Sequence, residues 1–340
     1  MARKSVHAIA AALFAATALP VTAQETEEQV GHPPASPAGW EAPRTVWGDP
    51  DLRGTYPLDL GRTPMQRPAQ FGTRALYTRE EYLQAVDAAD QLAGGADRED
   101  NANMLGSGNW FEWGRTLRQN SFIVEPDDGR IHMNDEGHRR AALMKSSWSQ
   151  DVFDGVEDFN SLDHCITRGL PASMIPFPYN NGLRVFQSPG YVVINLEMIH
   201  ETRIIPLDGR PQLSGEIDTW IGSSRGYFEG NTLVVETTNF NGETPMVIVG
   251  PSNQPIPTST SMKIVEHFTL YGPEQVFYEA WIEDPEVLEE PFKMGFPWKR
   301  DDSYEPFEYA CHEGNTIVRA YILATSPRFA EYRLANGGTE

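Results

Sequence analysis

Apolar and polar residues alternate along most of the second half of the chain, which is the pattern of β-strands that bury one face. The strand-like runs are short, and turn residues such as Asp208-Gly209 and Gly230-Asn231 separate them. Short connections between consecutive strands favour antiparallel pairing over parallel strands, which need a long crossover connection. Strands are expected over residues 183–187, 191–199, 202–207, 226–228, 232–239, 261–270, 275–282, 292–298 and 316–323. Residues 151–340 therefore predict a mainly β domain, with an antiparallel, lipocalin-like barrel as the expected architecture.

Residues 24–75 predict a linker followed by an N-terminal extended arm. Prolines recur at positions 43, 50, 57 and 64, and their spacing excludes a helix. Trp40, Trp47 and Tyr56 are large enough to anchor such an arm by burial. We therefore expect the arm to lie over the body of the protein.

Residues 76–150 predict a segment with two short helices and a hairpin between them. The first helix begins with a Thr-x-x-Glu capping box at Thr78 and is expected to end at Gly94-Gly95. Residues 121–132 resemble a hairpin with an Asp-Gly turn. The second helix is expected over residues 135–148. Both helices are expected to pack outside the barrel.

Residues that can hold charge lie inside several of the expected strands. Alternation places Glu266 on the same face as Phe268, and Glu279 on the same face as Trp281. We expect both carboxylates to turn inward, into a cavity where desolvation raises the pKa of a carboxyl group and suits it to acid–base catalysis. The competing interpretation is that each glutamate is exposed or ion-paired and has a structural role.

His200 continues the apolar face of the 191–199 strand, at the end of the strand where a barrel mouth would lie. It is the third candidate catalytic residue beside Glu266 and Glu279, and a packed histidine without a catalytic role is the alternative. An arginine near such residues either neutralises a buried carboxylate or binds an anionic substrate. The candidate substrate-binding residues are Glu197, Arg203, Arg225, Glu236, Asn239, Trp281 and His312.

Residues 1–23 have the features of a secretory signal. Arg3 and Lys4 precede an apolar run over residues 8–19, and small residues stand before the expected cleavage site after Ala23. The run is short for a membrane span, so a retained anchor is only the alternative. Cleavage leaves 25 basic against 48 acidic residues, a net charge of −23. We expect a periplasmic or secreted protein with a small-molecule ligand and no membrane contact after cleavage. Nucleic acid is not an expected partner, because it binds to basic patches.

The two cysteines of the chain, Cys165 and Cys311, predict one disulfide in an oxidising compartment. The bond would close a loop of almost half the chain, and two buried free thiols are the alternative. Neither close Cys-x-x-Cys spacing nor a His-Glu-x-x-His motif is present. We therefore expect neither a metal nor a cofactor.

Several long phrases resemble those of a large family of secreted bacterial proteins of unassigned function. These phrases are WGDPDLRG at 47–54, CITRGLP at 165–171, MIHETRIIPLDGR at 198–210, SRG at 224–226, the run 230–240 and YACHEGN at 309–315. The resemblance covers most of the mature chain, although Tyr56 and Phe228 stand where tryptophan would be expected. It implies a shared fold and export, and it implies no catalytic residue.

The leading function expected from the sequence is an exported enzyme that acts on an apolar or aromatic small molecule by carboxylate and histidine chemistry, as a lyase, isomerase or hydrolase. The alternatives are a non-catalytic periplasmic carrier and a structural or interaction module of the cell envelope. A cavity that holds Glu266, Glu279 and His200 together would indicate the enzyme. A purely apolar cavity would indicate the carrier, and a filled interior the structural module. The oligomeric state is not indicated by the sequence.

Overall fold

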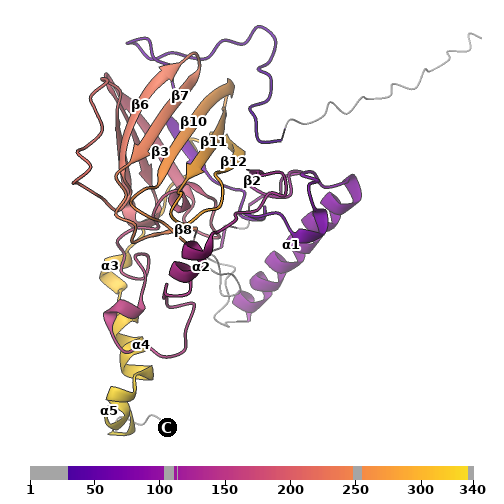
Figure 1. The fold of residues 1–340 in the computed structure, drawn as a ribbon. Helices are drawn as coiled ribbons and strands as arrows, with labels where there is room; N and C mark the ends of the chain where they lie inside the picture. Colours follow the sequence, from indigo (N-terminus) through magenta and orange to yellow (C-terminus); the bar gives the residue numbers. More distant parts are fainter. Residues whose placement is uncertain (1–29, 103–110, 113, 248–254, 336–340) are drawn as a thin grey trace, which may run out of the picture.

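The computed structural model describes residues 30–102, 111–112, 114–247 and 255–335, so the expected signal peptide lies outside the described residues. Two antiparallel sheets enclose one hydrophobic core (Figure 1). The strand order of the first sheet is β1 (Gly54–Pro57), β3 (Gly182–Ser188), β4 (Tyr191–Leu196) and β5 (Thr202–Pro206). The order of the second is β2 (Ile123–Glu125), β12 (Phe292–Lys299), β11 (Gln275–Glu283), β10 (Lys263–Gly272), β7 (Thr232–Thr238) and β6 (Ser223–Glu229). β8 (Pro245–Val247) and β9 (Ile256–Pro257) form a separate pair.

The two sheets approach each other at both edges. β5 lies beside β6, and the carbonyl oxygen of Thr55 in β1 accepts a hydrogen bond from the backbone nitrogen of Asp301, just after β12, at 2.9 Å. Between the described strands, however, no ladder of backbone hydrogen bonds joins one sheet to the other. The predicted mainly β, antiparallel fold is confirmed, and the finer prediction of a lipocalin-like barrel is not.

Apolar side chains fill the space between the sheets. Val185 and Ile194 of the first sheet face Leu233 and Phe268 of the second, and Trp298 closes one side. These side chains leave a cavity of only about 10 Å³ among them. That is roughly the space of a single water molecule. Around this site the described side chains form a packed core, without room for the ligand that the sequence led us to expect there.

The extended arm contributes to the sheet as well as covering it. Tyr56 in β1 is buried, and its hydroxyl donates to the carbonyl oxygen of Leu52 at 2.8 Å. Trp40 packs against the core, whereas Trp47 is half-buried and donates to Asp49. The arm supplies β1 and the following segment supplies β2, so the sheets recruit strands from the residues that precede the expected β domain.

The first expected helix is α1 (Arg79–Asn101), which is longer than predicted. Its capping box is present, because Thr78 Oγ1 accepts from the Glu81 backbone nitrogen at 3.2 Å and Glu81 Oε2 accepts from the Thr78 backbone nitrogen at 2.8 Å. The helix continues through Gly94-Gly95, since glycine inside a helix costs only about 1 kcal/mol per residue. Among the described residues, no helix has both the length and the apolar character needed to cross a membrane.

The second expected helix ends early, as α2 (Asp135–Ala141). Ser149 Oγ accepts from the Ser146 backbone nitrogen at 2.9 Å, and such side-chain hydrogen bonds compete with helix formation. The expected hairpin over 121–132 is wrong: β2 pairs with β12 instead of with a following strand. The turn itself is present, with Gly129 at a φ of 65°.

The expected strand over residues 316–323 is also wrong, because this segment forms the helix α4 (Ile317–Thr325). Its apolar residues stand at positions 317, 318, 321 and 322, which also share one face of a helix. The neighbouring helices are α3 (Cys311–Gly314) and α5 (Ala330–Ala335), and α3 to α5 extend away from the sheets (Figure 1). Tyr321 stacks on Phe153 and Phe159, with ring centroids 5.1 and 6.3 Å away. The short 3₁₀ turns are η1 (Ala69–Phe71), η2 (Val156–Asp158), η3 (Ala172–Met174), η4 (Met198–His200) and η5 (Pro327–Phe329).

Candidate functional site

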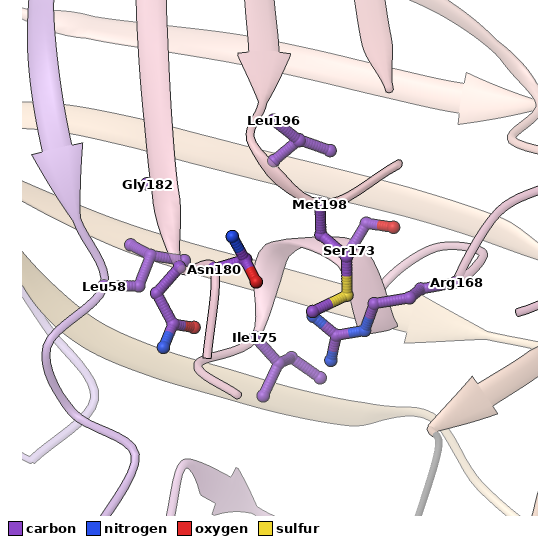
Figure 2. Close-up of a pocket in the computed structure, with 9 residues that line it drawn as sticks. Leu58, Arg168, Ser173, Ile175, Asn180, Gly182, Leu196 and Met198 are labelled. Carbon is purple, nitrogen blue, oxygen red and sulfur yellow. The ribbon is translucent and has the colours of Figure 1, made fainter. Parts of the chain in front are cut away.

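A small polar pocket lies at one end of the four-stranded sheet, where β3 begins and β4 ends (Figure 2). Its wall combines the loop before η3, the η3 turn, residues 180–182 and the end of β4. The cavity has a volume of about 10 Å³, and the lining includes Leu58, Arg168, Ser173, Asn180, Asn181 and Met198. Three of the long phrases in the sequence meet in this region, namely those at 165–171, 198–210 and 309–315.

Arg168 is the charged residue of the pocket. Its side chain extends toward the middle of the pocket beside Met198 (Figure 2). The residue is only 6% exposed, and its Nε has no hydrogen-bond partner. The ring of Phe177 lies 4.4 Å from the guanidinium carbon, in a cation–π contact. Burial lowers the pKa of Arg168 to about 10, so the group is still a cation at neutral pH.

The loop around Arg168 is fixed by its neighbours in the sequence. Gly169 has a φ of 77° and packs so closely on Thr244 that a Cβ would lie 2.7 Å from the Thr244 Cβ. Only glycine suits both the backbone conformation and the space. Thr167 Oγ1 accepts from the Gly169 backbone nitrogen at 2.8 Å. The sequence thus holds the arginine between two constrained residues.

Glu201 lies next to the pocket, between two buried arginines. Its carboxylate accepts from Thr167 Oγ1 at 2.5 Å and from Ser173 Oγ at 2.7 Å. Burial raises the pKa of Glu201, and the two hydroxyl donors and the charges of Arg203 and Arg168 oppose that rise. Among the described ion pairs, neither arginine is in salt-bridge contact with Glu201. The carboxyl group is therefore held by two hydroxyl donors and not by an ion pair.

Two tyrosines stand near the guanidinium of Arg168. The hydroxyl of Tyr179 donates a hydrogen bond to that of Tyr309. Burial raises the pKa of Tyr179 to about 12, so its hydroxyl stays protonated. The Tyr179 ring also meets Phe177 edge-on, with centroids 4.9 Å apart. Arg168 thus lies in an aromatic surrounding that carries hydroxyl groups but no paired carboxylate.

Glu197, an expected substrate-binding residue, supports the pocket from behind. Its buried carboxylate accepts from Asn180 Nδ2 at 2.7 Å, from the Gly182 backbone nitrogen at 3.0 Å and from the Tyr304 hydroxyl at 2.8 Å. The backbone nitrogen of Phe307 donates a fourth bond at 3.0 Å. Since both oxygens are occupied, Glu197 positions the pocket wall and has little capacity left for a ligand.

Two other expected site residues form an ion pair inside the core. Arg203 donates to both oxygens of Glu266, at 2.9 and 2.5 Å, and each side chain is 1% exposed. The Tyr278 hydroxyl donates to the same carboxylate at 2.9 Å. The prediction that Glu266 turns inward is confirmed, but its surroundings are packed side chains and a bidentate arginine.

Glu279 lies on the opposite face of the same sheet, so the expectation that it turns inward is wrong. In the register of β10 and β11, Glu266 pairs with Ala280 and His267 pairs with Glu279, which places the two glutamates on different faces. Glu279 is nevertheless buried, with Lys293 Nζ 2.8 Å and His32 Nδ1 3.5 Å from its Oε1. Trp281 stands beside it, with Lys293 Nζ 4.7 Å from the ring centroid.

His200 and His312 are both exposed, and neither lies on an apolar face. β4 ends at Leu196, and the chain turns through Ile199 and His200, which have φ angles of 60° and 54°. The expected continuation of the strand to His200 is therefore wrong. His312 lies in α3. The three expected catalytic residues are not brought together: Glu266 is in the core, Glu279 is on the outer face of a sheet and His200 is on a turn.

The remaining expected substrate-binding residues make contacts within the protein. Arg225 donates to the carbonyl oxygens of Pro211 and Ser224, at 2.9 and 2.7 Å. Half-exposed Glu236 pairs with Lys263 at 2.5 Å. Asn239 is shown to hold a loop in place, because its Nδ2 donates to the carbonyl oxygens of Ser214 and Ile217 at 3.0 and 3.1 Å.

The predicted disulfide between Cys165 and Cys311 is confirmed. It joins the loop that carries Arg168 to the segment that carries Tyr309. The sequence analysis did not name Arg168, Glu201 or Tyr309 among the candidate site residues. One signal in the sequence could have placed Arg168 and Tyr309 near each other. Arg168 is three residues from one cysteine of the predicted disulfide, and Tyr309 is two residues from the other.

Within the described part of the chain, no group of three or more His, Cys, Asp or Glu side chains is arranged to hold a metal ion. Comparisons with protein-family models, with curated proteins and with solved structures found no match to the chain. The resemblance to a secreted bacterial family thus stays a prediction from the phrases of the sequence.

Proposed function

We propose that the protein binds a small organic anion, such as a carboxylate, through Arg168. The observation that carries the proposal is a buried guanidinium whose Nε has no hydrogen-bond partner and which forms no salt bridge among the described residues. A buried charge without a partner costs several kcal/mol, so a fold that keeps one has a reason to do so. A ligand carboxylate supplies both the opposite charge and an oxygen acceptor for the guanidinium.

The pocket selects for a small charged group. Its volume of about 10 Å³ accommodates a single water-sized group, so one ligand oxygen enters and the rest of the molecule stays at the rim. The half-exposed rings of Phe177 and Tyr179 lie near the guanidinium of Arg168. An apolar or aromatic body attached to the anion would therefore find a matching surface.

The test is a thermal-shift titration of the mature protein with acetate, benzoate, succinate and phosphate. A ligand at 100 times its Kd stabilises the folded state by about 2.7 kcal/mol. We expect at least one organic anion to raise the Tm of the wild type and to leave that of Arg168→Met unchanged. Arg184→Gln is the matched control, because Arg184 is exposed on the outer face of β3 and its loss removes the same charge. An equal response of Arg168→Met and the wild type would exclude binding at Arg168.

Glu201 supports a second candidate function, an acid–base enzyme that acts on the bound anion. Its raised pKa and its place beside Arg168 give it the role that the sequence analysis assigned to Glu266 and Glu279. Consumption of a bound carboxylate, followed by NMR, would be lost in Glu201→Gln while binding persists. A bound anion that is not consumed would favour the carrier over the enzyme. The filled interior supports the remaining alternative, a structural module, which predicts no anion binding at all.

Export is part of the proposal. It is supported by the signal-like residues 1–23 and by the Cys165–Cys311 disulfide, a bond typical of oxidising compartments. The measurement is the mass of the protein recovered from the periplasm or the medium. We expect an N-terminus at Gln24, and an intact residue 1 in an exported sample would contradict cleavage.

A further inference from the structure

The lining of the Arg168 pocket shows which kind of anion fits inside it. The cavity has a volume of about 10 Å³, the space of roughly one water molecule. An apolar part of its wall is formed by Leu58, Ile175, Leu196 and Met198. The side chain of Arg168 extends toward the middle of this space (Figure 2). A buried cation therefore borders a cavity that has room for one small group.

The uncharged polar side chains of the lining are engaged in hydrogen bonds within the protein. Ser173 Oγ donates to Glu201 at 2.7 Å. Asn180 Nδ2 donates to Glu197 at 2.7 Å, and Asn181 Nδ2 donates to a backbone carbonyl oxygen of its own loop. An oxyanion held entirely inside the cavity would bury acceptor oxygens that these engaged donors leave unpaired, which is unfavourable. A monatomic anion has no further acceptor atoms to satisfy.

Electrostatic attraction favours an ion over a water molecule in the same space. Arg168 is in none of the described ion pairs, and Glu201 acts on its charge only at longer range. A buried water molecule typically needs about three hydrogen bonds, and it brings no charge. A halide neutralises the buried cation, and buried charges are normally paired. Attraction between whole charges acts over several ångströms, so it does not require contact with the covered Nε of Arg168.

We propose that a halide ion, chloride in ordinary salt solutions, occupies this cavity beside Arg168 when no organic anion is bound. The proposal rests on the anion site of the proposed function and adds a regulation to it, because the halide and a ligand oxygen compete for one small space. The affinity for an organic anion should then fall as the chloride concentration rises. Chloride at ten times its own Kd should weaken the apparent affinity about tenfold.

The first experiment measures halide binding in the absence of any organic anion. The Tm of the full mature chain is followed in sodium chloride and in sodium fluoride, because fluoride holds its hydration water more tightly and equal ionic strength removes general screening. Chloride at about ten times its Kd should raise the Tm of the wild type by roughly 2 °C relative to fluoride. Arg168→Met should lose this difference. Arg184→Gln should keep it, since Arg184 is exposed on β3. No difference in the wild type, or an equal one in Arg168→Met, would overturn the proposal.

The second experiment locates the ion. Crystals of the mature protein grown in sodium bromide should show an anomalous bromide peak in the cavity beside Arg168. Bromide peaks only elsewhere on the molecule would indicate an adventitious ion only, and the proposal would fall.

A third experiment separates this proposal from the proposed function. Benzoate is titrated into the wild type by calorimetry in each of the two sodium salts, and binding should be weaker in chloride than in fluoride. Benzoate binding of equal strength in both salts would keep the organic-anion site and overturn the halide. A bromide peak beside Arg168 in a protein that binds no organic anion would keep the halide site and remove the proposed function.

Discussion

Substitutions of two buried arginines, Arg203 and Arg168, are expected to have opposite effects on the free energy of unfolding. Comparing them tests whether Arg168 is retained for ligand binding. Arg203 is paired with Glu266 at 2.5 Å, whereas Arg168 has no carboxylate partner among the described residues. Arg203→Met leaves the Glu266 carboxylate buried without its counter-ion, which costs about 3–5 kcal/mol. Arg168→Met removes an unpaired charge and so relieves a desolvation penalty. It loses the contact with Phe177, worth up to about 2 kcal/mol.

The net expectation for Arg168→Met without ligand is a stability at or above that of the wild type, since the relieved penalty of several kcal/mol exceeds the lost contact of up to about 2 kcal/mol. Urea unfolding followed by far-UV circular dichroism measures both variants under one condition. The slope of free energy against urea must stay constant for the comparison to hold. A loss of about 3 kcal/mol or more in Arg168→Met would mean that this arginine supports the fold as Arg203 does. The proposed function would then lose its main support.

Two further predictions concern residues that the sequence analysis singled out. The Cys165–Cys311 bond spans 146 residues, so its removal in a Cys165→Ser/Cys311→Ser protein should lower the free energy of unfolding by up to about 5 kcal/mol in the loop-entropy model; a difference below about 1 kcal/mol by urea unfolding would contradict this. His200→Asn keeps a residue that tolerates the positive φ of 54°. Because His200 is exposed, its Tm should stay near that of the wild type, and a large drop would show a packed role.

The strands were predictable because turn residues and alternation are local signals. The Gly230-Asn231 turn connects β6 to β7, and the turn at Gly272 connects β10 to β11. Both hairpins lie where the sequence predicted them. The faces of Glu266 and Glu279 were not predictable in the same way. Alternation fixes faces within one strand, but only the register between strands relates one strand to the next. A register in which Glu279 opposes His267 sends it to the outer face.

The Arg168 pocket depends on contacts between distant segments, which no local pattern contains. Arg168 and Glu201 are 33 positions apart in the sequence, and Tyr309 is over a hundred residues further on. The disulfide was the one long-range constraint that the sequence offered, and it does join the first and the last of these segments. The α4 helix shows a different error, because its apolar positions 317, 318, 321 and 322 have helical spacing, whereas one face of a strand would include Arg319 between Ile317 and Tyr321.

The pH dependence of stability tests the environment of Glu201 directly. Burial raises the pKa of this carboxyl group above its value of 4.5 in the unfolded chain, so between the two pKa values the folded state binds more protons. Stability from this group is therefore present at low pH and is lost as the pH rises through the folded pKa. Glu201→Gln cannot titrate, so the stability of the wild type relative to this variant should fall as the pH rises from about 4.5 through the folded pKa. Hydrogen bonds from Thr167 and Ser173 and the charges of Arg168 and Arg203 act in the opposite direction. A relative stability that rises over this range would show that those groups outweigh burial.

An anion bound at Arg168 adds a negative charge near Glu201, so the decline with pH should become steeper in its presence, and anion affinity should be highest where Glu201 is protonated.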